Sequence, residues 1–218
     1  MSYLDYGRTP RLHASKTSGR GSGAELFVVE GDSAARAVLA ARDAELQAVL
    51  PMQGKPLNPV RASRSKILAN AFYRPLIQAV GGGFDVDVVP RHARYDRVLM
   101  LFDPDADGIH ASALLLMFFG RWMRPMVEHG LVHAVRAPFA TVEHPRLAGP
   151  VQAYSKEDLT GIRSRLAEAG AHDPQVRYYR GLASIDAGTL WASCLDPATR
   201  RQSAMGLGEV ENATAVFG

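Results

Sequence analysis

The sequence lacks features that define several classes of protein. It has a single cysteine, Cys194, among 218 residues, which excludes an intramolecular disulfide framework and a metal site built from clustered cysteines. No apolar run approaches about 18 residues, so no segment is predicted to span a membrane. The first residues have neither the basic start nor the apolar core of a secretory signal. We therefore expect a soluble, cytoplasmic protein.

Excess charge is also scarce outside one segment. The formal net charge is +3, and residues 1–24 supply all of it, with four basic residues against one acidic residue. This segment is rich in glycine, serine and threonine, so it cannot bury enough apolar surface to fold alone. We expect a disordered basic tail over residues 1–24. Such a tail suits contact with a phosphate backbone, and equally a solvated terminus without a partner.

Short apolar segments alternate with helical patterns through the first two thirds of the chain. The segments that read as buried strands are residues 25–30, 97–102 and 131–137, and those that read as helices are residues 34–50, 65–80 (broken near Pro75) and 109–128. Strands that alternate with helices predict an α/β fold, in which helices flank a parallel sheet.

The sequence pattern changes after Pro138. A loop rich in proline and glycine over residues 143–150 predicts a hairpin tip or a domain boundary. A helix is predicted over residues 155–169, because Ser155 can cap its start and acids fill its first turn. We therefore divide the chain after its tail into an α/β domain over residues 25–140 and a small α-rich C-terminal region over residues 141–218.

Acidic residues follow two of the predicted strands. Glu30 ends the first strand, and Asp103, Asp105 and Asp107 follow the second. In open α/β sheets, functional groups collect beyond the carboxyl ends of the strands. If the two strands are neighbours, four carboxylates converge, and so much like charge requires a cation. Oxygen donors without cysteine or paired histidine favour Mg²⁺ or Mn²⁺ over zinc.

Two other interpretations of these acids exist. The Asp-x-Asp-x-Asp-Gly pattern also opens the calcium loop of helix–loop–helix proteins, which needs a glutamate at its twelfth position. Counted from Asp103, that position is Leu114, and the preceding segment reads as a strand rather than a helix. The second interpretation is that the acids only cap helices, a role that Asp32 and Asp107 could fill.

These motifs resemble a known family. Residues 30–34 (EGDSA) and 103–110 (DPDADGIH) are similar to the two signature motifs of the TOPRIM domain in type IIA DNA topoisomerases. Residues 51–58 (PMQGKPLN), 179–182 (YRGL) and 190–201 are similar to segments of the B subunits of that class, which include those of DNA gyrase and topoisomerase IV. The resemblance implies a Rossmann-like TOPRIM domain and a bacterial, nucleoid-associated protein.

The resemblance also implies roles for single residues. Glu30, Asp103 and Asp105 would be catalytic Mg²⁺ ligands, Asp107 would support a second metal position, and Lys55 would lie near the cleaved DNA end. The candidate DNA contacts are the basic residues Lys55, Arg61, Arg64, Lys66, Arg177 and Arg180. The implied partners are DNA, an A-type subunit that carries the nucleophilic tyrosine, and a separate ATPase-domain protein where ATP is used.

The chain departs from the family pattern at several positions. The family's B subunits carry an ATPase and a transducer domain before this region, whereas only about 24 residues stand there in this chain, so we expect it to lack both. Gln53 replaces a basic residue, Arg180 replaces a lysine, and Ala183-Ser184 replace Gly-Glu. The metal acids are kept while residues on the DNA side differ, which predicts a working metal site beside an altered partner surface.

Three functions are compatible with this pattern. The first is a metal-binding topoisomerase module that acts with an A-type subunit on DNA and has no activity alone. The second is a truncated paralogue of the B subunits that binds the A subunit or DNA and modulates or protects gyrase without catalysis. The third is a stand-alone metal nuclease on the same fold, against which the topoisomerase-like C-terminal block argues.

Overall fold

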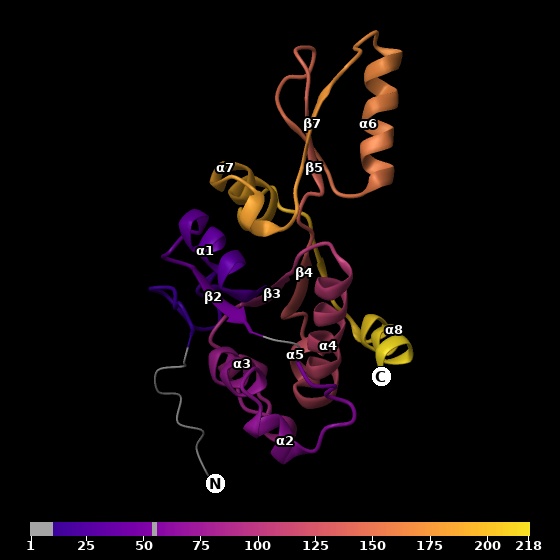
Figure 1. The fold of residues 1–218 in the computed structure, drawn as a ribbon. Coiled ribbons are helices and arrows are strands. Elements are labelled where there is room, and N and C mark those ends of the chain that lie inside the picture. Colours follow the sequence, from indigo (N-terminus) through magenta and orange to yellow (C-terminus); the bar gives the residue numbers. More distant parts are fainter. Residues whose placement is uncertain (1–10, 54–55) are drawn as a thin grey trace.

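A computed structural model describes residues 11–53 and 56–218. Its main sheet has the strand order β2-β1-β3-β4-β8, in which the first four strands are parallel and β8 is antiparallel (Figure 1). A second sheet has the order β6-β5-β7 and is antiparallel. The strands are β1 (Glu25–Glu30), β2 (Gln47–Met52), β3 (Arg97–Leu101), β4 (Val132–Val135), β5 (Ala140–Glu143), β6 (Val151–Ala153), β7 (Gln175–Tyr178) and β8 (Gln202–Ala204).

Helices lie against the sheets in the predicted α/β arrangement. Within the described ranges, none is long and apolar enough to cross a membrane. The helices are α1 (Gly31–Ala41), α2 (Arg64–Ala69), α3 (Tyr73–Val80), α4 (Ala106–Trp122), α5 (Arg124–Glu128), α6 (Lys156–Glu168), α7 (Ala187–Leu190) and α8 (Leu207–Phe217), with short turns η1 (Asp85–Asp87), η2 (Pro90–His92), η3 (Leu182–Ser184) and η4 (Trp191–Leu195).

The central strand β1 is buried on both faces, as its unbroken apolar run predicts. Leu26 and Val28 belong to a core cluster that includes residues of α3 and α4. Phe27 and Val29 point to the other face, into a cluster with residues of α1, α7 and η4. All four side chains are fully buried, so the sheet sits between two helical layers and its strand ends are fixed from both sides.

The helix expected over residues 34–50 is wrong in its second half. α1 ends at Ala41, and residues 47–52 form β2 at the edge of the sheet beside β1. Between them, the carboxylate of Asp43 accepts a hydrogen bond from the Glu45 backbone N–H at 2.8 Å. Such a local bond stabilises a turn and competes with the helix. The strand then forms because burial against β1 outweighs local helix propensity.

The helix over residues 65–80 is interrupted, but before Pro75 rather than at it. α2 ends at Ala69 and α3 begins at Tyr73. The Asn70 side-chain oxygen accepts hydrogen bonds from the backbone N–H groups of Phe72 and Tyr73, at 3.0 and 3.1 Å, and so stabilises the turn that leads into α3. Pro75 falls in the first turn of α3, where its missing N–H costs little.

The expected disorder of the N-terminal tail is wrong for residues 11–24. His13 and Val49 exchange two backbone hydrogen bonds of 2.9 Å, which attach the segment to the edge of β2. The Asp96 carboxylate accepts hydrogen bonds from the N–H groups of Gly21 and Gly23, at 2.7 and 2.6 Å. Main-chain bonds, which composition does not reveal, therefore order this segment. The rest of the predicted tail, residues 1–10, lies outside the described residues.

The C-terminal region divides between two parts of the fold. Its first part forms the β6-β5-β7 sheet with α6. The sequence predicts the hairpin tip over residues 143–150, and residues 144–150 join β5 to β6. Figure 1 shows this unit extending away from the main sheet. Its second part returns to the main sheet, where β8 pairs with β4, α7 contacts α1, and α8 packs along α4. The region is therefore not one separate unit but also completes the α/β domain.

Candidate metal centre

The structure places the four predicted acids at the same edge of the main sheet. β1 and β3 are parallel neighbours, so Glu30 at the end of β1 lies beside the segment that follows β3. The pKa of Glu30 is raised, first by burial and then by the negative charges of Asp105, Asp103 and Asp107. All three aspartates therefore act electrostatically on Glu30, as the positions of the two strands predict.

A pocket of about 610 Å³ opens beside these acids. Glu30, Asp32 and Asp107 line it from the starts of α1 and α4, and Gln53 lines it from the end of β2. The Gln53 side chain donates a hydrogen bond from Nε2 to Asp32 Oδ2 at 2.7 Å. The residue that stands in place of the family's basic one is thus bonded to an acid at the rim of the site.

Asp105 has a structural role in addition to its predicted one. It is the N-cap of α4, and its Oδ1 accepts a hydrogen bond from the Gly108 N–H at 2.8 Å. A Cβ atom on Gly108 would lie 2.1 Å from the Asp103 carbonyl oxygen, so the turn admits only glycine. Glu30, by contrast, makes no side-chain capping bond to α1. The capping interpretation therefore holds for Asp105 and not for Glu30.

Asp103 is tied to a distant part of the chain. Its Oδ1 accepts a hydrogen bond of 2.8 Å from the backbone N–H of Leu182, at the start of η3. Burial raises the pKa of Asp103, the Leu182 N–H opposes that rise, and the charge of Asp105 adds to it. The role of Leu182 is not visible in the sequence, because a main-chain N–H has no residue signature. The one sequence feature that marks this position is Gly181, in the YRGL segment that resembles the family.

The donor set fits a hard divalent cation. The carboxylates of Glu30 and Asp103 both have raised pKa values, which means that their negative charge is poorly compensated. A Mg²⁺ or Mn²⁺ ion would relieve that repulsion, and oxygen donors are the ligands these ions prefer. Within residues 11–53 and 56–218, no three His, Cys, Asp or Glu side chains stand preassembled as a metal cage. The acids therefore lie near one another, but their side chains are not arranged to coordinate one ion together.

The structure argues against the calcium-loop interpretation. The residue at the twelfth position, Leu114, is buried in the middle of α4 and has no side-chain oxygen. The segment before Asp103 is the strand β3 and not an entering helix. A calcium loop of the helix–loop–helix type needs both features.

Arg61 donates a hydrogen bond from Nη2 to the Gly218 carbonyl oxygen at 2.6 Å, beside Phe217, whose ring stacks on His110 near the start of α4. Two other predicted DNA contacts lie away from the acids. Arg64 pairs with Asp85 at 3.2 Å and covers Phe84, whose ring stacks on Trp122 at the end of α4. The acids lie at the other end of that helix, which is about 25 Å long at 1.5 Å per residue. Lys66 is exposed on α2, the same helix as Arg64.

The two other described candidates lie on the C-terminal segment, shortly before the turn that contacts Asp103. Arg177 and Arg180 are exposed, and Arg177 Nη1 lies 3.9 Å from Asp186 Oδ2. Arg180 directly precedes Gly181, against which the Asp103 carboxylate packs. Arg180 is therefore the predicted DNA contact that the chain itself places beside the acids. Lys55 lies outside the described residues.

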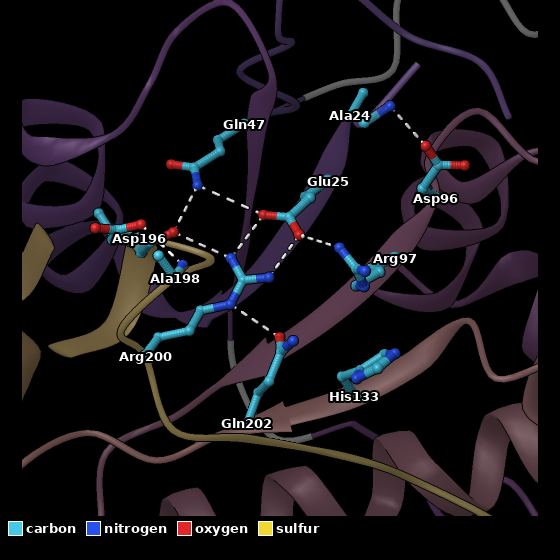
Figure 2. Close-up of polar contacts among 12 residues, drawn as sticks. Ala24, Glu25, Gln47, Asp96, Arg97, His133, Asp196, Ala198, Arg200 and Gln202 are labelled. Carbon is cyan, nitrogen blue, oxygen red and sulfur yellow. Dashed lines mark hydrogen bonds and ion pairs between the residues drawn. The ribbon is translucent and has the colours of Figure 1, made fainter. Parts of the chain in front are cut away.

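A buried polar cluster at the opposite end of β1 is not predicted by the sequence (Figure 2). The two oxygens of Glu25 accept hydrogen bonds of 2.5 and 2.6 Å from the Arg200 guanidinium, whose side chain is 0% exposed. Gln47 donates to the Leu195 carbonyl at 2.8 Å, and Arg97 reaches Glu25 at 3.1 Å from the solvent side. The cluster joins the start of β1 to the segment before β8.

Comparison with known proteins agrees with this architecture. The model of the Toprim domain family matches residues 25–137, and the chain belongs to this family. The chain is 35% identical over 217 residues to the DNA gyrase B subunit of Halalkalibacterium halodurans, an alignment that covers 99% of this chain and 33% of that protein. The DNA gyrase B subunit of Enterococcus faecalis is 37% identical over 195 residues, with 88% of this chain and 30% of the relative covered.

The DNA gyrase B subunit of Streptococcus pyogenes serotype M3 gives a similar result, with 34% identity over 99% of this chain and 34% of the relative. The resemblance inferred from the motifs is thus confirmed, and the chain is a module of the type II topoisomerase kind. It spans about a third of the length of these relatives.

Proposed function

We propose that this chain is the Mg²⁺-binding module of a type II DNA topoisomerase and supplies the metal for DNA strand cleavage and religation together with an A-type subunit. The observation that carries the proposal is the group of acids at the carboxyl ends of β1 and β3, in which Glu30 has a pKa raised by burial and by three aspartates. Similarity to the B subunits of DNA gyrase along the chain supports DNA as the substrate.

Each acid has a role in this proposal. Glu30, Asp103 and Asp105 would hold the ion, with Mn²⁺ able to replace Mg²⁺, and Asp107 would support a second position. When bound, such an ion polarises a phosphoryl oxygen and stabilises a leaving alkoxide. In this proposal, the resemblance to the family assigns Glu30 two roles: it binds the ion and it helps the proton transfers of strand cleavage and religation.

DNA would approach from the side of the C-terminal segment. Arg180 stands beside the acids, and Arg177 is exposed on the neighbouring strand β7. Binding through such residues rests on phosphate contacts, so it should weaken steeply as salt rises. A nucleoid location follows from the DNA substrate, and any use of ATP would come through a separate ATPase-domain protein.

Calorimetry with Mg²⁺ and Mn²⁺ tests the metal site directly. The wild type is expected to bind the ion, and the Asp103→Asn/Asp105→Asn variant to lose binding. The matched control is Asp87→Asn/Asp173→Asn, which removes the same charge from two exposed positions outside the acid group. The proposal fails if the wild type binds neither ion, or if both double variants bind like the wild type.

A second function is favoured by one observation. The acids of the described residues do not form a closed metal cage, as expected of a paralogue that binds the A subunit or DNA and modulates gyrase without catalysis. Reconstitution with an A-type subunit and plasmid DNA separates the two. A Mg²⁺-dependent cleavage complex supports the first function, whereas binding without cleavage supports the second. Nicking by the purified chain alone, lost in Glu30→Ala, would instead indicate a stand-alone nuclease.

A further inference from the structure

We infer that the turn formed by Gly181 and Leu182 is a positioning element for the Asp103 carboxylate and thereby sets the affinity of the metal centre. This inference rests on the proposed function. The two partners are 79 residues apart in sequence and meet through one main-chain hydrogen bond, from Leu182 N–H to Asp103 Oδ1 at 2.8 Å. Gly181 and Leu182 would act on the ion through Asp103 and would not touch it.

Contact with Gly181 limits where the carboxylate can lie. A Cβ atom at position 181 would lie 2.6 Å from Asp103 Oδ2 and 3.0 Å from its Cγ, well inside van der Waals contact. The glycine also has φ +148°, a conformation that side chains disfavour. Because this position has no side chain, the backbone can approach the carboxylate closely. Oδ1 is held by Leu182, while no donor among the described residues is bonded to Oδ2, so Oδ2 remains available for a cation.

The turn is rigid enough to position a ligand. The Ser184 hydroxyl donates to the Gly181 carbonyl at 2.7 Å and accepts from the Arg180 N–H at 3.0 Å. The Leu182 side chain is fully buried in the core cluster that contains Leu99 and Leu101 of β3. The strand that leads to Asp103 and the turn that holds its carboxylate are therefore packed in the same core. Ser184, one of the departures from the family pattern, closes the turn.

The turn also joins the acids to the smaller sheet. Residues 179–181 connect β7 to η3, so they form one of the two links between the β6-β5-β7 unit and the main sheet. A cation on Asp103 would stabilise the docked position of this link, and movement of the link would shift the carboxylate. Metal affinity and the seating of the C-terminal segment are then coupled through a single hydrogen bond.

Mn²⁺ calorimetry on two variants tests the positioning role without any assay of activity. Gly181→Ala adds the Cβ that displaces the carboxylate, and a loss of affinity of about tenfold is expected, as for other groups that orient metal ligands. Ser184→Ala loosens the turn without a clash, and a smaller loss is expected. The matched control is Gly130→Ala, which also places alanine at a positive φ (+67°) but in open space, and should bind Mn²⁺ like the wild type.

A second measurement needs no variant to fold. In a Mg²⁺ titration followed by ¹⁵N NMR, the Leu182 amide should shift in step with the backbone amide of Asp103. The Ala198 amide serves as internal control, because it donates a comparable bond of 2.9 Å to the carboxylate of Asp196, outside the acid group, and it should not move.

The outcomes separate the inference from the proposed function. If the wild type binds Mn²⁺ and both Gly181→Ala and Ser184→Ala bind it equally well, the inference is overturned and the proposed function stands. A Leu182 amide that stays still while Asp103 responds overturns the inference in the same way. If the wild type binds neither Mg²⁺ nor Mn²⁺, the proposed function fails and the positioning role toward a metal fails with it.

Discussion

A glutamate stands at each end of β1, and the two have opposite electrostatic environments. At its amino end, Glu25 is buried and both of its oxygens are bonded to Arg200. At its carboxyl end, Glu30 is half-buried, and the charges that the described residues bring near it are the negative ones of Asp103, Asp105 and Asp107. Four residues separate a compensated carboxylate from an uncompensated one, although both belong to one strand of one sheet.

This contrast shows what distinguishes a structural acid from a candidate functional one. Burial alone does not, because Glu25 is the more buried of the two. What differs is the partner, since a buried carboxylate is stable when a guanidinium and further hydrogen bonds satisfy it. Within residues 11–53 and 56–218, no cationic group or hydrogen-bond donor is bonded to the Glu30 side chain, and a bound cation would compensate its charge. The uncompensated charge at the carboxyl end of β1 therefore lowers the stability of the metal-free protein and favours the binding of a cation.

Removal of Arg200 should have the largest effect. Arg200→Met leaves Glu25 buried with only the ion pair to Arg97 and a long hydrogen bond of 3.5 Å from Gln47 among the described residues, and a loss of about 3–5 kcal/mol in the free energy of unfolding is expected. Urea denaturation measures it. The control is Arg201→Met, whose exposed pair with Asp158 should be worth about 0–1 kcal/mol.

The double variant Glu25→Leu/Arg200→Met sharpens this first test. It removes both charges, so it should recover much of the stability that the single change loses, because the main cost is an unpaired buried charge. If the double variant is no more stable than Arg200→Met, Glu25 and Arg200 do not act as a compensating pair.

Lower pH should weaken metal binding at the carboxyl end. The pKa values of Glu30 and Asp103 are raised, so these acids take up protons at a higher pH than ordinary carboxyls, and protons compete with the ion. Mg²⁺ affinity should fall as pH decreases from 7 to 5, by at most about tenfold per pH unit for each displaced proton. Calorimetry at three pH values measures the slope, which should be shallower in Glu30→Gln. If the slope is unchanged in that variant, protonation of Glu30 does not contribute to the pH dependence of metal affinity.

Neutralisation of Glu30 should stabilise the metal-free protein. A raised folded-state pKa means that the folded state binds the proton more tightly, so the charged form costs stability at neutral pH and this cost disappears as pH falls toward 4.5. In the presence of a chelator, Glu30→Gln should unfold at a higher temperature, by at most about 2 °C, because solvent screens much of the charge at a partly exposed position. The gain should vanish near pH 4. Glu143→Gln, at an exposed position in β5, should change nothing.

Arg97 should matter least. Its side chain is 42% exposed and adds one contact of 3.1 Å to a Glu25 that Arg200 already satisfies. Arg97→Ala is expected to cost roughly 0.5 kcal/mol in urea denaturation. A cost equal to that of Arg200→Met would mean that the Glu25 cluster is held mainly from its solvent side, which would contradict the contrast between the two ends of β1.

The features that local pattern encodes could be predicted from the sequence. The buried strands β1, β3 and β4 follow from apolar runs, and the grouping of the acids follows from the rule that parallel strands end at one edge. The boundary between α1 and β2 could not be predicted, because Ala34 to Leu50 is almost continuously compatible with a helix. Only pairing with β1 converts its end into a strand.

Features that depend on distant partners could not be predicted either. β8 is three residues long and polar, so nothing local marks it, and its pairing with β4 exists only in the folded protein. The Glu25–Arg200 pair joins residues 175 positions apart. The bond from Leu182 to Asp103 uses a main-chain donor, which any residue but proline supplies.

The late return of the chain to its first strand has a consequence for biosynthesis. At a translation rate of about 5–20 residues per second, Arg200 is synthesised roughly 10–35 s after Glu25. Until β8 follows it, the open edge of β4 also exposes unpaired N–H and C=O groups, the kind of edge that templates aggregation. The nascent domain therefore passes through a vulnerable period that lasts until β8 is made and pairs with β4. Stalled or prematurely terminated chains should be the principal source of misfolded material.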